Sequence, residues 1–249
     1  MGAVSSHDDE VMVAVPEVGR VYGGRQRVRL GDITPSGTVR LDAVARYLQD
    51  VANDDAYDSG IANPAEWVVR RTVIEVRQPA HLREDLELRT FCSGTGPCWA
   101  ERRTSVQGSS GASIEAATLW VQVAAASGRP VRLDPHFVAV YGPSAAGRTV
   151  KARLRLTESV PLDAATLVFP LRFSDLDVLG HVNNAVYWSM VQECFAGDVE
   201  RSAPFRVEVE HHHELGPGAS VQLRCLGDRV WVCDGDQVSA AAVRRWMNA

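Results

Sequence analysis

The chain repeats part of its own sequence, and this internal repeat constrains the fold more than any other feature. A shift of 143 positions aligns Arg29 with Arg172, Asp32 with Asp175, Gly37 with Gly180, Val39 with Val182 and Gln49 with Gln192, without a gap. A shift of 135 positions aligns Glu75 with Glu210, Leu88 with Leu223 and Arg89 with Arg224. Because repeated units share one architecture, we expect two copies of a single fold.

Hydrophobic periodicity predicts one long helix in each copy, over residues 39–59 and 184–200, and Gly60 is placed to end the first helix. Each helix follows a short extended run and precedes several strand-like segments. These segments are 67–77, 86–92, 99–107 and 113–124 in the first copy, and 205–212, 220–225, 229–233 and a tail from 238 in the second. The order predicts an α+β fold in which an antiparallel sheet packs on a helix.

The repeat divides the chain into four segments. We expect a tail at 1–19, an N-terminal copy at 20–130, a connector at 131–164 and a C-terminal copy at 165–249. The run Gly142-Pro143-Ser144 predicts loop within the connector.

Composition excludes several classes of protein. The 249 residues are 45% hydrophobic and 23% charged, which is typical of a globular protein, and the net charge of −5 argues against a nucleic-acid partner. No apolar run approaches the ~20 residues of a membrane span, and the acidic N-terminus does not resemble a signal peptide. The five cysteines are odd in number and lack C-x-x-C spacing, so we expect reduced thiols in a cytoplasmic protein.

The two copies differ at titratable positions. Thr34 aligns with Asp177, Thr38 with His181 and Pro79 with Glu214, whereas the shared positions are glycine, apolar or architectural. This pattern predicts one working site per chain, supplied by the C-terminal copy. Asp175 is shared with Asp32 and is therefore expected to have a structural role in a turn or cap.

Residues 172–184 read Arg-Phe-Ser-Asp-Leu-Asp-Val-Leu-Gly-His-Val-Asn-Asn, and this run resembles the Asp-x-Asp-x-x-Gly-His-Val-Asn-Asn pattern of the hotdog-fold thioesterases. The tandem layout, with the runs at 67–71 and 209–216, is similar to the acyl-ACP thioesterase family. The resemblance implies a double hotdog, two copies of a long helix wrapped by an antiparallel sheet. It also implies catalytic roles for Asp177, His181 and Glu214.

The sequence departs from that family at two positions. Leu179 stands where the plant members carry an asparagine, and Leu215 stands where they carry a cysteine. A mechanism that needs a thiol at position 215 is therefore excluded. A mechanism that needs the asparagine amide requires a substitute.

The chemistry of a thioester defines what each residue must supply. Gly180, Val182 and Asn184, at the start of the second helix, are expected to offer unpaired backbone N–H groups or positioning contacts to the substrate oxygen. Asp177 or Glu214 could activate water or attack directly, and His181 could orient the carbonyl or a carboxylate. A structural role is the alternative to catalysis for these residues. Asp177 could be a turn aspartate that bonds nearby N–H groups, and Asn183 and Asn184 could cap the helix.

The expected function is hydrolysis of a fatty acyl-ACP without a metal or an organic cofactor. An acyl-CoA thioesterase and a non-catalytic acyl-binding protein remain the alternatives. A zinc site in His211-His212-His213 is disfavoured, because only alternate strand residues share a face. A basic run at Arg148, Lys151, Arg153 and Arg155 could steer an acidic ACP or be a solvated surface. We expect the halves to pair as an intrachain pseudo-dimer and leave a homodimer open.

Overall fold

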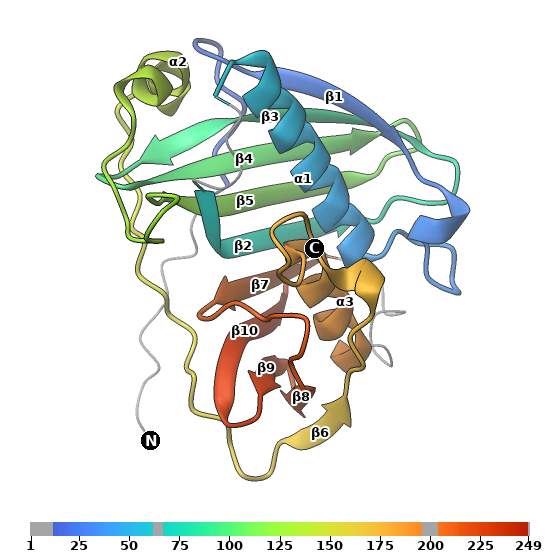
Figure 1. The fold of residues 1–249 in the computed structure, drawn as a ribbon. Coiled ribbons are helices and arrows are strands. Elements are labelled where there is room, and N and C mark those ends of the chain that lie inside the picture. Colours follow the sequence, from blue (N-terminus) through green and yellow to red (C-terminus); the bar gives the residue numbers. More distant parts are fainter. Residues whose placement is uncertain (1–11, 62–66, 196–203, 249) are drawn as a thin grey trace, which may run out of the picture.

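The computed structural model describes residues 12–61, 67–195 and 204–248. Its centre is one antiparallel sheet in the order β1-β3-β4-β5-β2-β7-β10-β9-β8-β6 (Figure 1). The strands of the first half are β1 (Tyr22–Arg27), β2 (Trp67–Gln78), β3 (Asp85–Thr95), β4 (Trp99–Gly108) and β5 (Ser113–Gln122). Those of the second half are β6 (Ala165–Val168), β7 (Phe205–His211), β8 (Val221–Leu226), β9 (Arg229–Asp234) and β10 (Gln237–Trp246).

The strand registers confirm both shifts of the internal repeat. The 135-position shift matches Glu75 on β2 with Glu210 on β7. Following the paired residues from β2 through β5 and β4 leads to Arg89 on β3, and following them from β7 through β10 and β9 leads to Arg224 on β8. Arg89 and Arg224 are also a predicted match. The next pairing outward reaches position 23 on β1 and position 166 on β6, which are 143 positions apart. The two halves are therefore related by a pseudo-two-fold axis between β2 and β7, which pair directly.

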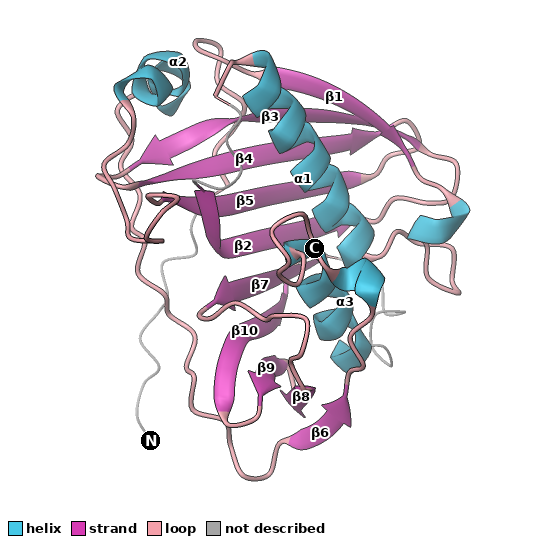
Figure 2. Ribbon diagram, viewed as in Figure 1, coloured by secondary structure: helices cyan, strands magenta, loops and turns pink. Residues whose placement is uncertain are grey.

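Two long helices cover one face of this sheet. Helix α1 (Leu41–Asp58) follows the short 3-10 helix η1 (Leu30–Asp32), and α3 (Asn184–Phe195) follows η3 (Phe173–Asp175). Figure 2 shows α1 and α3 on the same side of the strands, and the two helices contact each other. Their apolar faces and the inner face of the sheet form one continuous core across both halves. This arrangement is the predicted double hotdog.

The predicted helix and strand positions are largely confirmed. The first helix ends at Asp58, and Gly60 follows with a φ of +73°, a conformation that glycine adopts without steric cost. The second helix begins at Asn184 as predicted. Its predicted end at residue 200 lies outside the described residues.

The connector contains a helix that includes the run 142–144, which was predicted to be loop. Helix α2 (Pro135–Ala145) begins at Asp134, whose carboxylate accepts a hydrogen bond from the backbone N–H of His136. Phe137 and Tyr141 are buried, and the helix packs against β3. The prediction was wrong because Pro143 lies in the last turn of α2, where the surrounding packing outweighs its low helix propensity.

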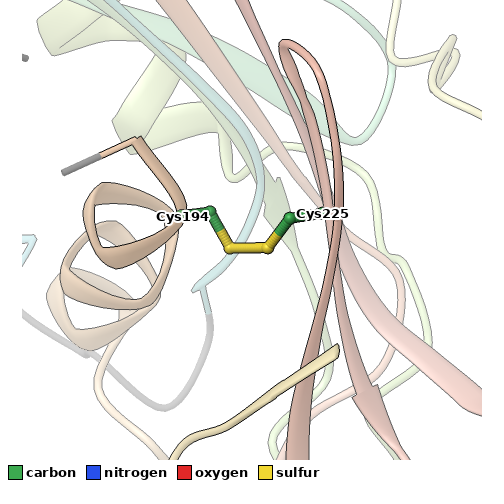
Figure 3. The surroundings of a disulfide bond; sticks show 2 residues. All are labelled: Cys194 and Cys225. Atoms are coloured by element: carbon green, nitrogen blue, oxygen red, sulfur yellow. A yellow bond between two sulfur atoms is a disulfide. The ribbon is translucent and has the colours of Figure 1, made fainter. Parts of the chain in front are cut away.

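The prediction of five reduced thiols was also wrong. Cys194 on α3 and Cys225 on β8 form a disulfide, which Figure 3 shows, while Cys92, Cys98 and Cys233 are free. The bonded residues are 31 positions apart in sequence, with Cα atoms 6.1 Å apart. Only the packing of α3 onto the C-terminal strands brings them together.

The rest of the connector crosses the face of the sheet opposite the helices. Val207 and Val209 of β7 point into the core, so the alternate residue Glu210 points to the other face. There its carboxylate accepts hydrogen bonds from the backbone N–H groups of Arg155 and Leu156. The basic run therefore lies across the sheet from α1 and α3 where it passes Glu210.

Candidate active site

Asp177 begins a tight turn between η3 and α3. Its backbone N–H donates to the carbonyl of His181 at 2.8 Å, and the N–H of Gly180 donates to the carbonyl of Asp177 at 3.0 Å. Gly180 has a φ of +78°, which explains why glycine stands there. One carboxylate oxygen of Asp177, Oδ1, accepts from the N–H groups of Leu179 and His181. Asp177 thus has the bonds of a turn aspartate, and the turn fixes its carboxylate in place.

The structure corrects the predicted set of free N–H groups. The N–H of Gly180 is used within the turn, and the N–H of Val182 donates to the carbonyl of Leu215 at 2.9 Å. Both were expected to be unpaired, but the first closes the turn and the second joins it to Leu215, in the segment after β7. The backbone N–H of Asn184 makes no hydrogen bond within the described residues. Of the three positions, only Asn184 keeps an available donor.

The two residues assigned to structure behave as predicted. Asp175 is buried, and its carboxylate accepts from the backbone N–H of Arg172 at 2.8 Å. Asp32 makes the matching bond to the N–H of Arg29 in the first half. Asn183 caps α3, because its side-chain oxygen accepts from the N–H of Ala185 at 2.8 Å.

His181 and Glu214 form a second group beside this turn. Their side chains approach to 3.6 Å between Nε2 and Oε2, and they are 41% and 74% exposed. The backbone of His181 is paired with Asp177 across the turn, through its carbonyl and its N–H. In the first half the matching side chains, Thr34 and Thr38, are in contact, with hydroxyl oxygens 2.9 Å apart. The fold therefore brings all three predicted catalytic residues to one edge of the second half.

A cavity of about 550 Å³ extends from Asp177 into the first half of the molecule. Its volume lies in the range of small-molecule sites. Its walls come from α1, strands β2 to β5 and α2, and include four aromatic rings, of Trp67, Trp120, Phe137 and Tyr141. The ring of Phe137 stacks at 4.9 Å from both Trp67 and Tyr141. The second half thus supplies Asp177, and the first half supplies the aromatic wall and further polar side chains, among them Asp50, Glu101 and Arg102.

The free thiol in this cavity is not activated. Burial raises the pKa of Cys92 to about 11, so the thiol stays protonated near neutral pH. Leu179, at the position of the family's asparagine, is 49% exposed and offers no amide. The polar groups of the cavity are therefore its carboxylate and amide side chains and the guanidinium of Arg102.

A polar groove of about 560 Å³ lies beside the cavity, and Asn183 lines both. Three arginines lie along the groove: Arg40, Arg46 and Arg172. Each is paired with a neighbouring aspartate, and Arg172 remains 69% exposed. The groove runs along η3 and the start of α3, beside the turn that holds Asp177.

A sheet that packs on two central helices, with a carboxylate at the mouth of an apolar cavity, defines a double-hotdog hydrolase. Comparison with known families agrees. The acyl-ACP thioesterase N-terminal domain matches residues 19–141, and the acyl-ACP thioesterase C-terminal domain matches residues 161–240. The chain therefore belongs to the acyl-ACP thioesterase family and is a thioester hydrolase.

Relatives and solved structures support the same assignment. An uncharacterized protein of Mycobacterium tuberculosis H37Rv is 33% identical over 242 residues, covering 95% of this chain and 96% of the relative. The 12:0-ACP thioesterase from Umbellularia californica superposes with a TM-score of 0.75 at 20% identity, covering 91% of this chain and 97% of its own. A putative oleoyl thioesterase from Lactobacillus plantarum superposes with a TM-score of 0.76 at 19% identity, covering 93% and 98%. At these identities the two structures show a shared fold.

Proposed function

We propose that this chain hydrolyses fatty acyl-ACP to a free fatty acid and ACP. The observation that carries the proposal is the single cavity that joins Asp177 of the second half to the aromatic wall of the first half. An acyl chain lying against Trp67, Phe137 and Tyr141 would bring its thioester carbonyl to Asp177. No helix in the described residues is long and apolar enough to cross a membrane.

In the proposed reaction, the carboxylate of Asp177 takes a proton from water as the water oxygen attacks the thioester carbonyl carbon. The intermediate collapses by breaking the carbon–sulfur bond. His181, oriented by Glu214, gives a proton to the leaving sulfur. The products are the carboxylic acid and the carrier thiol. The proton that Asp177 took from water goes to solvent, and His181 regains a proton from solvent, so both side chains return to their starting states.

The polar groove supports a carrier-borne substrate. Both ACP and CoA present the acyl group on a phosphopantetheine arm, which is polar and needs a path from the surface to the carboxylate. In this proposal the groove that shares Asn183 with the cavity serves as that path. The exposed Arg172 at its side suits an acidic carrier. With ACP as its partner, the protein would act in the cytoplasm.

A thiol-release assay with the same acyl group on ACP and on CoA, over a series of acyl lengths, tests the proposal. We expect a higher kcat/KM for acyl-ACP than for acyl-CoA. Equal or faster turnover of acyl-CoA would overturn the ACP assignment and favour the CoA alternative. Release from neither carrier at any length would overturn hydrolysis of fatty acyl thioesters.

A further inference from the structure

Two glutamines occupy matching positions on α1 and α3 but have different surroundings. Gln49 and Gln192 are 143 positions apart, as are Leu41 and Asn184, the first residues of the two helices. The side-chain oxygen of Gln192 accepts a hydrogen bond from the backbone N–H of Leu41 at 2.7 Å. The pseudo-two-fold axis therefore places Gln49 beside the N–H of Asn184. Both residues line the same small cavity under α1.

The matching bond is absent in the second half. Neither the side chain of Gln49 nor the backbone N–H of Asn184 makes a hydrogen bond within residues 12–61, 67–195 and 204–248. In the first half, Gln192 satisfies a helix N–H that would otherwise lack an acceptor. In the second half, the N–H and the amide are both left open toward the space between them.

Gln49 also lines the large cavity that holds Asp177. Gln49 therefore lines both the cavity of Asp177 and the small cavity that Asn184 lines at the start of α3. An oxygen bound there would accept one hydrogen bond from the backbone of Asn184 and one from the Gln49 amide. Two donors converging on one oxygen are what a thioester carbonyl needs as negative charge develops on it.

We propose that Gln49 is a catalytic residue of the thioester hydrolysis. Its side-chain amide donates a hydrogen bond to the carbonyl oxygen of the substrate, together with the backbone N–H of Asn184. The inference rests on the proposed function and adds a residue from the N-terminal half to the chemistry. In the other half, the bond between Gln192 and Leu41 fills the equivalent position and closes it to a substrate.

The pseudo-two-fold axis supplies a matched control for the test. We compare Gln49→Ala with Gln192→Ala, using a short acyl thioester of N-acetylcysteamine so that carrier docking does not contribute. Gln49→Ala is expected to lower kcat by about 10²–10³-fold, the usual effect of removing one oxyanion donor, with KM little changed and an unchanged melting temperature. Gln192→Ala is expected to lower the melting temperature and leave kcat unchanged.

Three outcomes separate this inference from the function on which it rests. An active wild type with an equally active, folded Gln49→Ala protein would overturn the role of Gln49 alone. Equal losses of kcat in both variants would also overturn it, because the effect would then come from helix packing. An inactive wild type on all thioesters would instead overturn the proposed hydrolysis. Gln49→Glu, which removes the donor and keeps the shape, should match the loss in Gln49→Ala.

Discussion

Acid should destabilise this protein through His211, which lies at the end of β7 and contacts α3. The imidazole is buried, and its ring meets that of Tyr187 edge-on at 4.8 Å. Burial, together with the smaller effects of the nearby charges of Arg70 and His212, lowers the pKa of His211 to about 3. The folded protein therefore holds this histidine neutral, on the same strand that leads to Glu214.

The magnitude follows from the difference between the folded and unfolded pKa. In the unfolded chain, histidine has a pKa of about 6.5, so its neutral form dominates in both states at pH 7. At pH 5 the unfolded histidine binds a proton and the folded one does not, which costs about 2 kcal/mol of folding free energy. Because the folded pKa is depressed, the stability is present above pH 6.5 and is lost as the pH falls toward 3.

Urea unfolding at pH 7 and pH 5 measures this loss. In the wild type, the pH dependence of the unfolding free energy is the sum of the His211 contribution and those of the other titrating groups. His211→Phe removes the His211 contribution. We expect the change in unfolding free energy between the two pH values to be about 2 kcal/mol smaller in His211→Phe. His213→Phe, at an exposed position on the same segment, should leave the change as in the wild type. An identical pH dependence in wild type and His211→Phe would refute the reasoning.

Three other predictions concern the disulfide, a buried ion pair and the groove. Thiol titration of unfolded, unreduced protein should find three thiols, and a count of five would contradict the disulfide. Replacing both bonded cysteines with serine should lower the unfolding free energy by about 3–4 kcal/mol. Asp55→Ala should lower the free energy of unfolding in urea by about 3–5 kcal/mol, because this fully buried carboxylate pairs with two arginines. The control Asp58→Ala, whose side chain is exposed, should lower it by about 1 kcal/mol or less. In steady-state kinetics, Arg172→Ala should raise KM for acyl-ACP, and Arg153→Ala, on the connector, should not; the reverse would place docking on the connector.

The sequence was sufficient for the fold because the fold depends on regular patterns. The apolar periods of α1 and α3, and Gly60 after the first helix, are local signals that a single sequence displays. The structure keeps the shifts of 143 and 135 positions because the strands of the two halves pair in the same order. Matched residues therefore occupy equivalent positions in the strand registers. The differing shifts reflect segments of different length between matched strands.

The errors came from contacts between residues far apart in the chain. Helix α2 was missed because the aromatic packing of Phe137 outweighs the local signal of Pro143. The disulfide was missed because nothing in the sequence shows that α3 lies against β8.

The sequence names candidate residues for the site but not the hydrogen bonds that they make. The contrast between the copies singles out Asp177, whereas only the folded structure shows that the N–H of Gly180 closes its turn and the N–H of Val182 bonds to Leu215. Gln49 appeared in the sequence as half of a matched pair with Gln192. That its side chain has no hydrogen-bond partner among the described residues, while Gln192 has one, is a property of the folded structure.

The central claim is that one site per chain, in the C-terminal half, performs the hydrolysis. The most direct test compares kcat for Asp177→Asn with kcat for Thr34→Ala, its match in the other half, on one acyl-ACP substrate. We predict a loss of at least ~10²-fold for Asp177→Asn, as expected when acid–base catalysis is removed, and wild-type turnover for Thr34→Ala. Near-normal turnover by a folded Asp177→Asn protein, or equal losses in the two variants, would contradict the account.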